Sequence, residues 1–200
     1  MPEITTRLPT EARQAEIAAT LIALAGERSP GAITTTELAG ALGLSQGALF
    51  KHFPTKDAIW LAAIERVQAE LLQRLREAAD AAPTPLQGLQ AVFLAHARYL
   101  ADQPGVPRLI FHELQRPDDS EVKQRVRALL QAYRALVGQL IAQAVAQREL
   151  PAALDKEAAA TLFLGAIQGL VMQSMLAGKP RAVLKLAERV VSVLFAAWRP

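Results

Sequence analysis

Apolar residues recur along this chain at the spacing of helical faces, as Ile17, Leu21, Leu24 and Ala25 do in the first such segment. No stretch of alternating Val, Ile and Thr bounded by turn residues predicts a strand. Pro, Gly and capping residues separate the periodic segments, so the pattern predicts an all-α protein of about nine helices. These helices are expected over residues 10–27, 34–42, 45–53, 56–79, 85–99, 108–115, 120–148, 155–178 and 180–198.

The last two expected helices are unusually apolar. Ala158 to Gly178 is a run of 21 residues without a charge, which is long enough to cross a membrane. It contains Thr161 and Gln168 and has no flanking topology signal, so we interpret it as a helix buried in protein, with no membrane partner. The final helix is apolar around more of its circumference than one subunit's core would cover. We therefore expect a subunit interface here, formed by Gly165, Gly169, Val183, Val190, Leu194 and Trp198.

The segment from Thr34 to Trp60 has the spacing of a helix-turn-helix. Thr34 and Glu37 have the spacing of a capping box that opens a short helix. Gly43 breaks that helix, and Ser45 can cap a second short helix. One such helix lies in the DNA major groove while its partner braces it against the backbone. The spacing alone is weakly specific, because many helical hairpins share it.

Composition narrows the possible functions. The chain has no cysteine, which excludes a disulfide framework, a zinc finger and a thiol nucleophile. Its first residues, MPEITTRLPTEARQ, lack the apolar region of a signal peptide, so we expect a cytoplasmic protein. The net charge of +3 says little about a partner, but Leu38 to Lys56 holds two lysines and His52 and no acid. That local balance is compatible with a nucleic-acid partner.

The same segment resembles the signature of the TetR family of bacterial regulators. In that signature a T-T-x-E-[IL]-A helix leads through a G-[VL]-S turn into x-G-x-[LI]-[YF]-x-H-F and then x-[ST]-K-[DE]-x-[LI]. This chain matches it in register, except that Phe50 stands where the family commonly has a tyrosine, which removes a hydroxyl able to reach a phosphate. The resemblance implies a helix-turn-helix domain at residues 1–54 and a ligand-binding and dimerisation domain at residues 55–200.

That resemblance also implies contacts with double-stranded DNA. Ser45 would hold a phosphate at a helix N-terminus. Gln46 would pair with adenine and Lys51 with guanine, whereas Ala48 would pack on a thymine methyl group. The expected DNA contacts are Thr35, Ser45, Gln46, Gly47, Ala48, Phe50, Lys51, His52 and Lys56.

The implied activity is that of a homodimeric repressor, which binds a palindromic operator and is released by a small-molecule inducer. Two recognition helices placed about 34–36 Å apart read successive half-sites, which is a physical reason for a dimer. The hydrophobic composition favours an apolar or amphipathic inducer, and no cofactor is expected. Polar or aromatic residues on apolar helix faces are the candidate pocket residues, although an ordinary helical core has the same character. They are Phe93, His96, Tyr99, His112, Tyr133, Phe163, Gln168 and Met172, with Trp60 and Arg66 as further candidates.

Two other classes of protein were weighed. His96, His112 and Glu113 could imitate a metal or acid–base site, but no H-E-x-x-H, G-x-S-x-G or phosphate-loop pattern occurs. The sequence therefore predicts neither an enzyme nor a metal site. A helical adaptor without specific DNA binding stays an alternative, against which the retention of Lys51, His52 and Lys56 argues.

Overall fold

The computed structural model describes residues 9–178 and 181–198, and this part of the chain contains nine α-helices, one short 3-10 helix and no strand. The predicted all-α fold is confirmed. The helices are α1 (Thr10–Glu27), η1 (Pro30–Ala32), α2 (Thr35–Ala41), α3 (Gln46–Phe50), α4 (Lys56–Asp80), α5 (Pro85–Asp102), α6 (Gly105–Gln115), α7 (Glu121–Ala146), α8 (Lys156–Ala177) and α9 (Ala182–Ala196).

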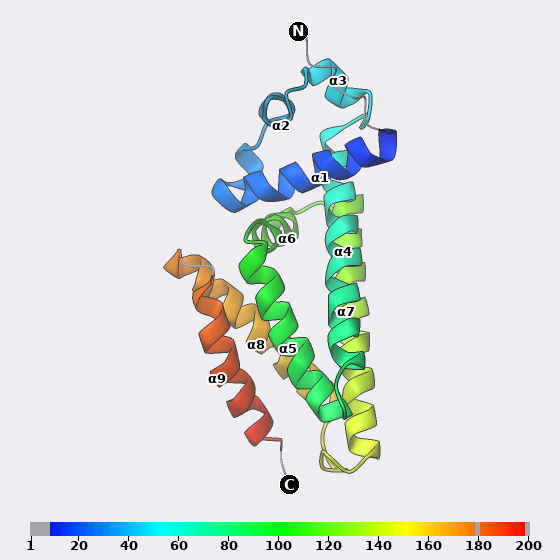
Figure 1. The fold of residues 1–200 in the computed structure, drawn as a ribbon, viewed down its shortest axis with the longest axis vertical. Helices are drawn as coiled ribbons and strands as arrows, with labels where there is room; N and C mark the ends of the chain where they lie inside the picture. Colours follow the sequence, from blue (N-terminus) through cyan, green and yellow to red (C-terminus); the bar gives the residue numbers. More distant parts are fainter. Residues whose placement is uncertain (1–8, 179–180, 199–200) are drawn as a thin grey trace.

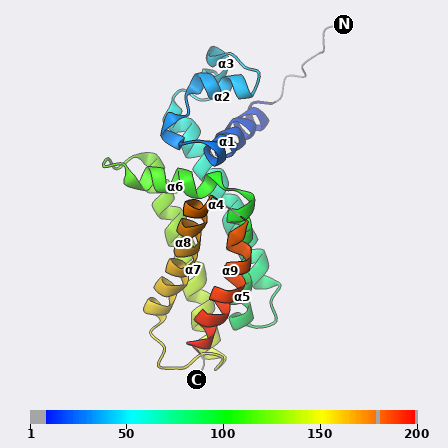
Figure 2. The same ribbon diagram turned by 90° about the vertical axis from the view of Figure 1, so that its left-hand side faces the viewer.

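The helices form a small N-terminal group and a larger bundle (Figure 1). Helices α1 to α3 lie at one end, and the long α4 runs from them along the bundle, where it packs against α5 and α7. The short α6 crosses the junction between the two groups. Helices α8 and α9 pack together on one side of the bundle, the side that faces the viewer in Figure 2.

Side-chain caps explain where most of the helices begin. An oxygen of a Ser, Thr or Asp side chain accepts a hydrogen bond from the first turn of six helices, which satisfies a backbone N–H that has no partner within the helix. At α2 the cap is reciprocal, since Glu37 also accepts from the backbone N–H of Thr34. The capping residues are Thr34, Ser45, Thr55, Thr84, Ser120 and Asp155.

Helix α6 begins three residues earlier than the sequence predicted, at Gly105 rather than at residue 108. Pro107 falls in its first turn, where the missing N–H costs no helical hydrogen bond. The early start brings the backbone of α6 directly onto α1. A Cβ atom at Gly105 would lie 1.8 Å from the carbonyl oxygen of Ile22, so only glycine allows this approach.

Helix α4 belongs to both parts of the molecule. Its first turns place Ile59 and Trp60 beside Leu21, Ile33 and Leu38 of the N-terminal group. Its later turns pack on α5 and α7. The division between residues 54 and 55 stays a prediction, because the core on either side of it is continuous along this helix.

Within residues 9–178 and 181–198, α8 is the one helix that is long and apolar enough to cross a membrane. Only a third of its most apolar window is buried inside the protomer. One face, including Phe163 and Ile167, lies in the core, whereas Leu162 and Leu176 are exposed. The predicted buried helix is therefore buried on one face only.

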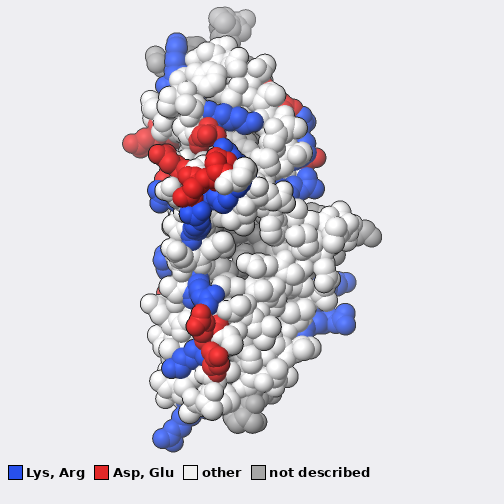
Figure 3. Space-filling model, turned by 180° about the vertical axis from the view of Figure 1, so that it is seen from behind, with Lys and Arg blue, Asp and Glu red and all other residues white. Residues whose placement is uncertain are grey.

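Charged side chains of both signs gather near the junction of the two parts when the molecule is seen from behind (Figure 3). Arg116 lies 3.7 Å from Asp57 and 2.8 Å from Asp118, and Arg125 lies 2.8 Å from Glu65. These ion pairs are mostly exposed, so each contributes little to stability by itself. Arg116 nevertheless connects the segment after α6 to α4, and Arg125 connects α7 to α4.

Candidate DNA-binding surface and ligand cavity

The helix-turn-helix is built by α2, the turn at Gly43 and α3. Gly43 has φ +66°, a left-handed conformation that glycine adopts without steric cost. Leu38, Ala39 and Leu49 are buried, and α2 packs on both α1 and α3. The outer side of α3 is thereby fixed as a surface that faces solvent.

That outer surface carries uncharged and basic side chains. Gln46, Gly47, Phe50 and Lys51 are exposed, and a Cβ at Gly47 would meet nothing within 4 Å. The Nε2 of Gln46 donates a hydrogen bond of 2.8 Å to Oγ1 of Thr35, which links the start of α3 to the start of α2. Four of the expected DNA contacts thus lie together on an open, acid-free surface.

Of the other expected DNA contacts Ser45 is also exposed, and the rest are half-buried. Ala48, Lys56 and Thr35 are half-buried. The Oγ of Ser45 accepts from the N–H of Ala48 at 3.1 Å, which leaves its hydroxyl hydrogen available to a phosphate. His52 is half-buried, and its Nδ1 is buried without a hydrogen-bond partner among the described residues. A phosphate could therefore reach the His52 ring only through Nε2.

The eight expected pocket residues do not form one site. His96 and Tyr133 do come together, with Nδ1 of His96 3.0 Å from the hydroxyl of Tyr133. Burial lowers the pKa of His96 to about 3 and raises the pKa of Tyr133. Both groups are therefore neutral near pH 7, and this pair is a polar spot in an apolar interior.

His96, Tyr133 and Gln168 line a cavity of about 90 Å³. Apolar side chains of α4 to α8 make up most of its wall, and α6 supplies Ile110 and Phe111. The sequence analysis missed these α6 residues, since their pattern is that of any amphipathic helix.

The remaining expected pocket residues lie elsewhere. Phe93 and Phe163 meet edge to face in the closed core, with ring centroids 5.3 Å apart. Tyr99 is buried beneath Arg74, and its hydroxyl has no hydrogen-bond partner in the described part of the chain. Met172 is 44% exposed on the outer face of α8. The sequence could not separate these positions, because helical periodicity does not say which neighbour a face meets.

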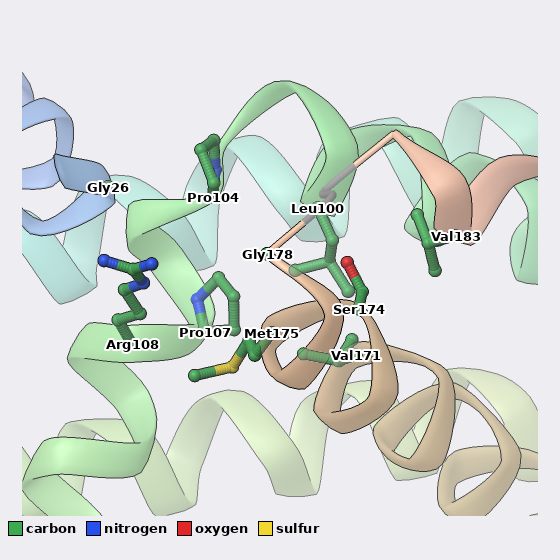
Figure 4. A pocket seen from close by; sticks show the side chains of 10 residues that line it. All are labelled: Gly26, Leu100, Pro104, Pro107, Arg108, Val171, Ser174, Met175, Gly178 and Val183. Atoms are coloured by element: carbon green, nitrogen blue, oxygen red, sulfur yellow. The ribbon is translucent and has the colours of Figure 1, made fainter.

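A second, larger cavity of about 250 Å³ lies between α1, α6, α8 and the start of α9 (Figure 4). Arg108 is the one charged residue among those that line it. In Figure 4 Arg108 stands at the side nearest Gly26, with Pro107 and Met175 between it and Val171. Sequence reasoning gave no signal for Arg108, whose role depends on the packing of α6 against α1.

His112 lies at the domain junction rather than in either cavity. Its ring centroid is 5.3 Å from that of Trp60, and its Cε1 would lie 3.0 Å from a Cβ at Gly31. Glu113, which is fully buried, accepts a hydrogen bond from Ser120 and lies 3.4 Å from Arg116. The described residues contain no group of three His, Cys, Asp or Glu side chains that could hold a metal ion.

Three of the expected interface residues face inward. Val183, Leu194 and Trp198 are 4–6% exposed within a single protomer, because α9 turns them onto its own core and packs on α5. They are core residues in this structure. Val190 is half-buried, and Gly165 and Gly169 are exposed. The large apolar side chains that do face outward on α8 and α9 were not expected at an interface: Leu162, Met172, Leu176 and Val193.

Comparisons with known families agree with this architecture. A model described as "Bacterial regulatory proteins, tetR family" matches residues 17–63, and one described as "Tetracyclin repressor-like, C-terminal domain" matches residues 115–190. The chain belongs to the TetR family. The resemblance seen in the sequence is confirmed, and the TetR fold is that of transcriptional regulators rather than of enzymes.

Individual TetR-like proteins extend the comparison over most of the chain. The nucleoid occlusion factor SlmA of Idiomarina loihiensis is 27% identical over 80% of this chain and 82% of its own length. The transcriptional regulator FadR of Bacillus subtilis, solved in complex with stearoyl-CoA, superposes with a TM-score of 0.77 at 18% identity, over 92% of this chain and 97% of FadR. The ketosteroid regulator KstR2 of Mycobacterium tuberculosis gives 0.76 at 18% identity, over 94% and 95%. At these identities the two solved structures establish the shared fold.

Proposed function

We propose that this protein is a homodimeric transcriptional repressor that binds a palindromic operator and is released by a small apolar or amphipathic molecule. The observation that carries this proposal is the position of α6. It lines the cavity beside His96 with one face and contacts the DNA-binding domain at both of its ends. The proposed place of action is the cytoplasm, where the DNA lies.

The proposed DNA surface is the outer side of α3 with the neighbouring phosphate contacts. Gln46 and Lys51 are exposed and have the chemistry that reads adenine and guanine in the major groove. Thr35, Ser45, His52 and Lys56 are proposed to hold the backbone, which positions the protein without reading sequence. Phe50, 39% exposed, offers the groove an apolar ring.

The proposed dimer forms through the outer face of α8 together with α9. Leu162, Gly165, Gly169, Met172 and Leu176 follow one another at alternating spacings of three and four, which places them on one stripe of the helix. The two glycines lie in open space, so a partner helix could approach the backbone closely. An apolar stripe this long on a monomer is typical of an interaction surface.

The proposed coupling runs through both ends of α6. At its N-terminal end, Gly105 rests on the carbonyl of Ile22 in α1. At its C-terminal end, His112 packs on Trp60 of α4. A movement of α6 would therefore be transmitted to α1 and to the first turns of α4 at once.

The size of the inner cavity supports a ligand-driven shift of α6. Its volume of about 90 Å³ is well below the roughly 300–1,000 Å³ of ordinary ligand sites, so a ligand would have to open it. Opening displaces α6 from α8 or from α7. The ligand then favours the shape that does not fit DNA, and it weakens DNA binding by its preference for that shape.

The relatives support a ligand-responsive function and also offer a second candidate. FadR was solved with stearoyl-CoA and KstR2 is named for ketosteroids, so apolar and amphipathic molecules are associated with this fold. The similarity to SlmA favours a nucleoid occlusion factor as the second candidate. A factor that acts on the nucleoid as a whole needs sites spread over the chromosome, whereas a local regulator needs few.

The proposal is tested by selecting genomic fragments with the purified protein and then screening compounds for release. The expected result is a small number of palindromic sites and at least one apolar or amphipathic compound that lowers the fluorescence anisotropy of the labelled site. Many dispersed sites with no releasing compound would favour the second candidate. Sequence-blind binding by correctly folded protein would support the adaptor alternative.

A further inference from the structure

The two cavities beside α6 are separated by one layer of side chains. The inner cavity at His96 and the outer cavity of Figure 4 share Leu100, Pro107 and Val171 as lining residues. Residues that line two cavities form the wall between them. Rotation of Leu100 and Val171 beside the fixed ring of Pro107 would join the cavities into one channel that runs from the surface near Gly26 to the His96–Tyr133 pair.

The chemistry changes along this channel. The inner cavity is lined by apolar side chains and by a neutral histidine and tyrosine. Arg108 is the one charged residue that lines the outer cavity. Its guanidinium group forms no ion pair or hydrogen bond with another described residue, whereas Arg116, just after the same helix, lies 2.8 Å from Asp118.

We propose that this channel binds an amphipathic anion, with its hydrocarbon tail in the inner cavity and its carboxylate or phosphate group at Arg108. The proposal deepens the ligand-responsive function proposed above and rests on it. A guanidinium group binds carboxylate and phosphate oxygens through two parallel hydrogen bonds. An apolar tail gains free energy from leaving water, and it meets no charged group beyond the mouth of the channel.

The position of Arg108 also explains how an anion would affect the DNA-binding domain. Arg108 lies beside the last turn of α1, near Gly26, where the free carbonyl groups give the helix end a partial negative charge. An anionic head group would attract the guanidinium group more strongly than the partial charge of this helix end does. It would draw Arg108 away from α1, close to the place where Gly105 meets Ile22.

The test is isothermal titration calorimetry on the full chain without DNA, with probes that share one tail and differ in the head group. Decanoate and decyl phosphate carry the two possible anions, decan-1-ol is neutral and decyltrimethylammonium is cationic, each below its micelle concentration. We expect at least one anion to bind roughly tenfold more tightly than decan-1-ol, because hydrogen bonds to charged groups are the stronger ones. The cation should bind least. The better of the two anions shows whether the head group is a carboxylate or a phosphate.

The head-group contact is tested by Arg108→Gln, with Arg108→Lys as the conservative variant. Arg98→Gln is the matched control, because Arg98 is exposed on α5 and lines neither cavity. Arg108→Gln should weaken the anion roughly tenfold and leave decan-1-ol within about twofold, whereas Arg98→Gln changes neither. Arg108→Lys should restore part of the anion's affinity, because lysine keeps the charge without the two-pronged geometry.

The tail is tested in the wild-type protein by comparing hexanoate, octanoate and decanoate. Each added methylene group should raise the affinity about fourfold while the tail still has room in the apolar cavity. Equal affinities for decanoate and decan-1-ol, equal losses of both in Arg108→Gln, or no binding of any probe would each overturn the proposal. No DNA is present in these titrations, so such a failure would be distinct from a failure to select an operator.

Discussion

The DNA-binding end and the bundle differ in how completely they are packed. Between Leu21, Ile33 and Trp60, where α1, α2 and α4 meet, the free space is about 10 Å³. The free space beside His96 inside the bundle is about 90 Å³, and the space beside Arg108, between the bundle and the end of α1, is about 250 Å³. A close-packed unit moves as one body, whereas a unit with cavities has room to rearrange. The DNA-binding end is therefore the more rigid part, and the bundle is the part that a ligand can deform.

Helix α6 contacts both the tightly packed part of the molecule and the part with cavities. Toward the cavities it presents Pro107, Ile110 and Phe111, whose neighbours leave free space. Toward α1 it presents the backbone of Gly105 in direct contact with Ile22. A loose contact on one side and a tight contact on the other is an arrangement that converts ligand binding into movement of the DNA-binding domain.

The largest expected effect comes from filling the tight contact. Gly105→Ala places a Cβ 1.8 Å from the carbonyl oxygen of Ile22 and 2.9 Å from the amide nitrogen of Gly26. We expect it to lower the free energy of unfolding by about 3 kcal/mol or more, because backbone on both sides must shift. Gly138→Ala is the control, since its Cβ meets nothing, and it should raise stability by up to about 1 kcal/mol. Urea unfolding at one protein concentration measures both, and equal stabilities would refute a tight α1–α6 contact.

The second prediction concerns the outer side of the bundle, where the proposed dimer face lies. Leu176 is 81% exposed in the protomer, and two-fold symmetry would place two copies of it in one interface. Leu176→Glu should weaken dimerisation by about 3 kcal/mol, or roughly 100-fold, through lost apolar burial and a buried charge. Sedimentation velocity over a concentration series measures this effect. Gln139→Glu, on the exposed side of α7, should sediment like the wild type, and a dimer unchanged by Leu176→Glu would place the interface elsewhere.

The DNA-binding end should respond to changes on its surface with little effect on stability. Gln46→Ala removes an exposed amide whose hydrogen bond is to the hydroxyl of Thr35. We expect operator binding to fall by about 2 kcal/mol, roughly 30-fold, with relaxed preference at one position of each half-site. Fluorescence anisotropy on operator variants measures both effects. Gln73→Ala, on exposed α4 of the bundle, is the control, and an unchanged base preference in Gln46→Ala would remove Gln46 from base readout.

The smallest expected effect is a dependence of the unfolding free energy on pH, which arises from His96 in the bundle. Burial lowers the pKa of His96 to about 3, whereas an unfolded chain has a histidine pKa near 6.5. Between these values the unfolded chain binds a proton that the folded protein does not, so stability falls as the pH drops below about 6.5. From pH 6.5 to pH 5.5 the loss is about 1 kcal/mol.

His96→Gln is the matched variant for this prediction, because glutamine keeps a polar partner for Tyr133 without titrating. The difference in unfolding free energy between the two proteins should therefore depend on pH below about 6.5. A constant difference from pH 7 to pH 5 would contradict a buried, neutral His96.

Local signals in the sequence predicted the DNA-binding end in detail. The caps at Thr34 and Ser45 and the positive φ of Gly43 depend on residues within a few positions of each other, so they can be read from a short segment. The early start of α6 could not be read in this way. It depends on contact between Gly105 and Ile22, which lie far apart in the chain.

The cavities and the exposed apolar face depend on such non-local packing as well. His96 and Tyr133 meet because α5 packs on α7, and periodicity marked both as candidates without pairing them. Helical periodicity likewise showed that α9 is apolar but not which of its residues face inward. Leu194 faces the core, whereas Val193 is 72% exposed.

The most direct test of the proposed function is a fluorescence anisotropy titration of the selected operator with the protein at several salt concentrations. The same titration gives the number of protomers bound to each operator. We expect two protomers for each palindrome and an affinity that falls steeply with salt, with a slope reduced by about 2 when Lys56→Ala removes one phosphate contact from each half-site. Binding that ignores sequence, or that occurs with one protomer per site, would contradict the proposed function.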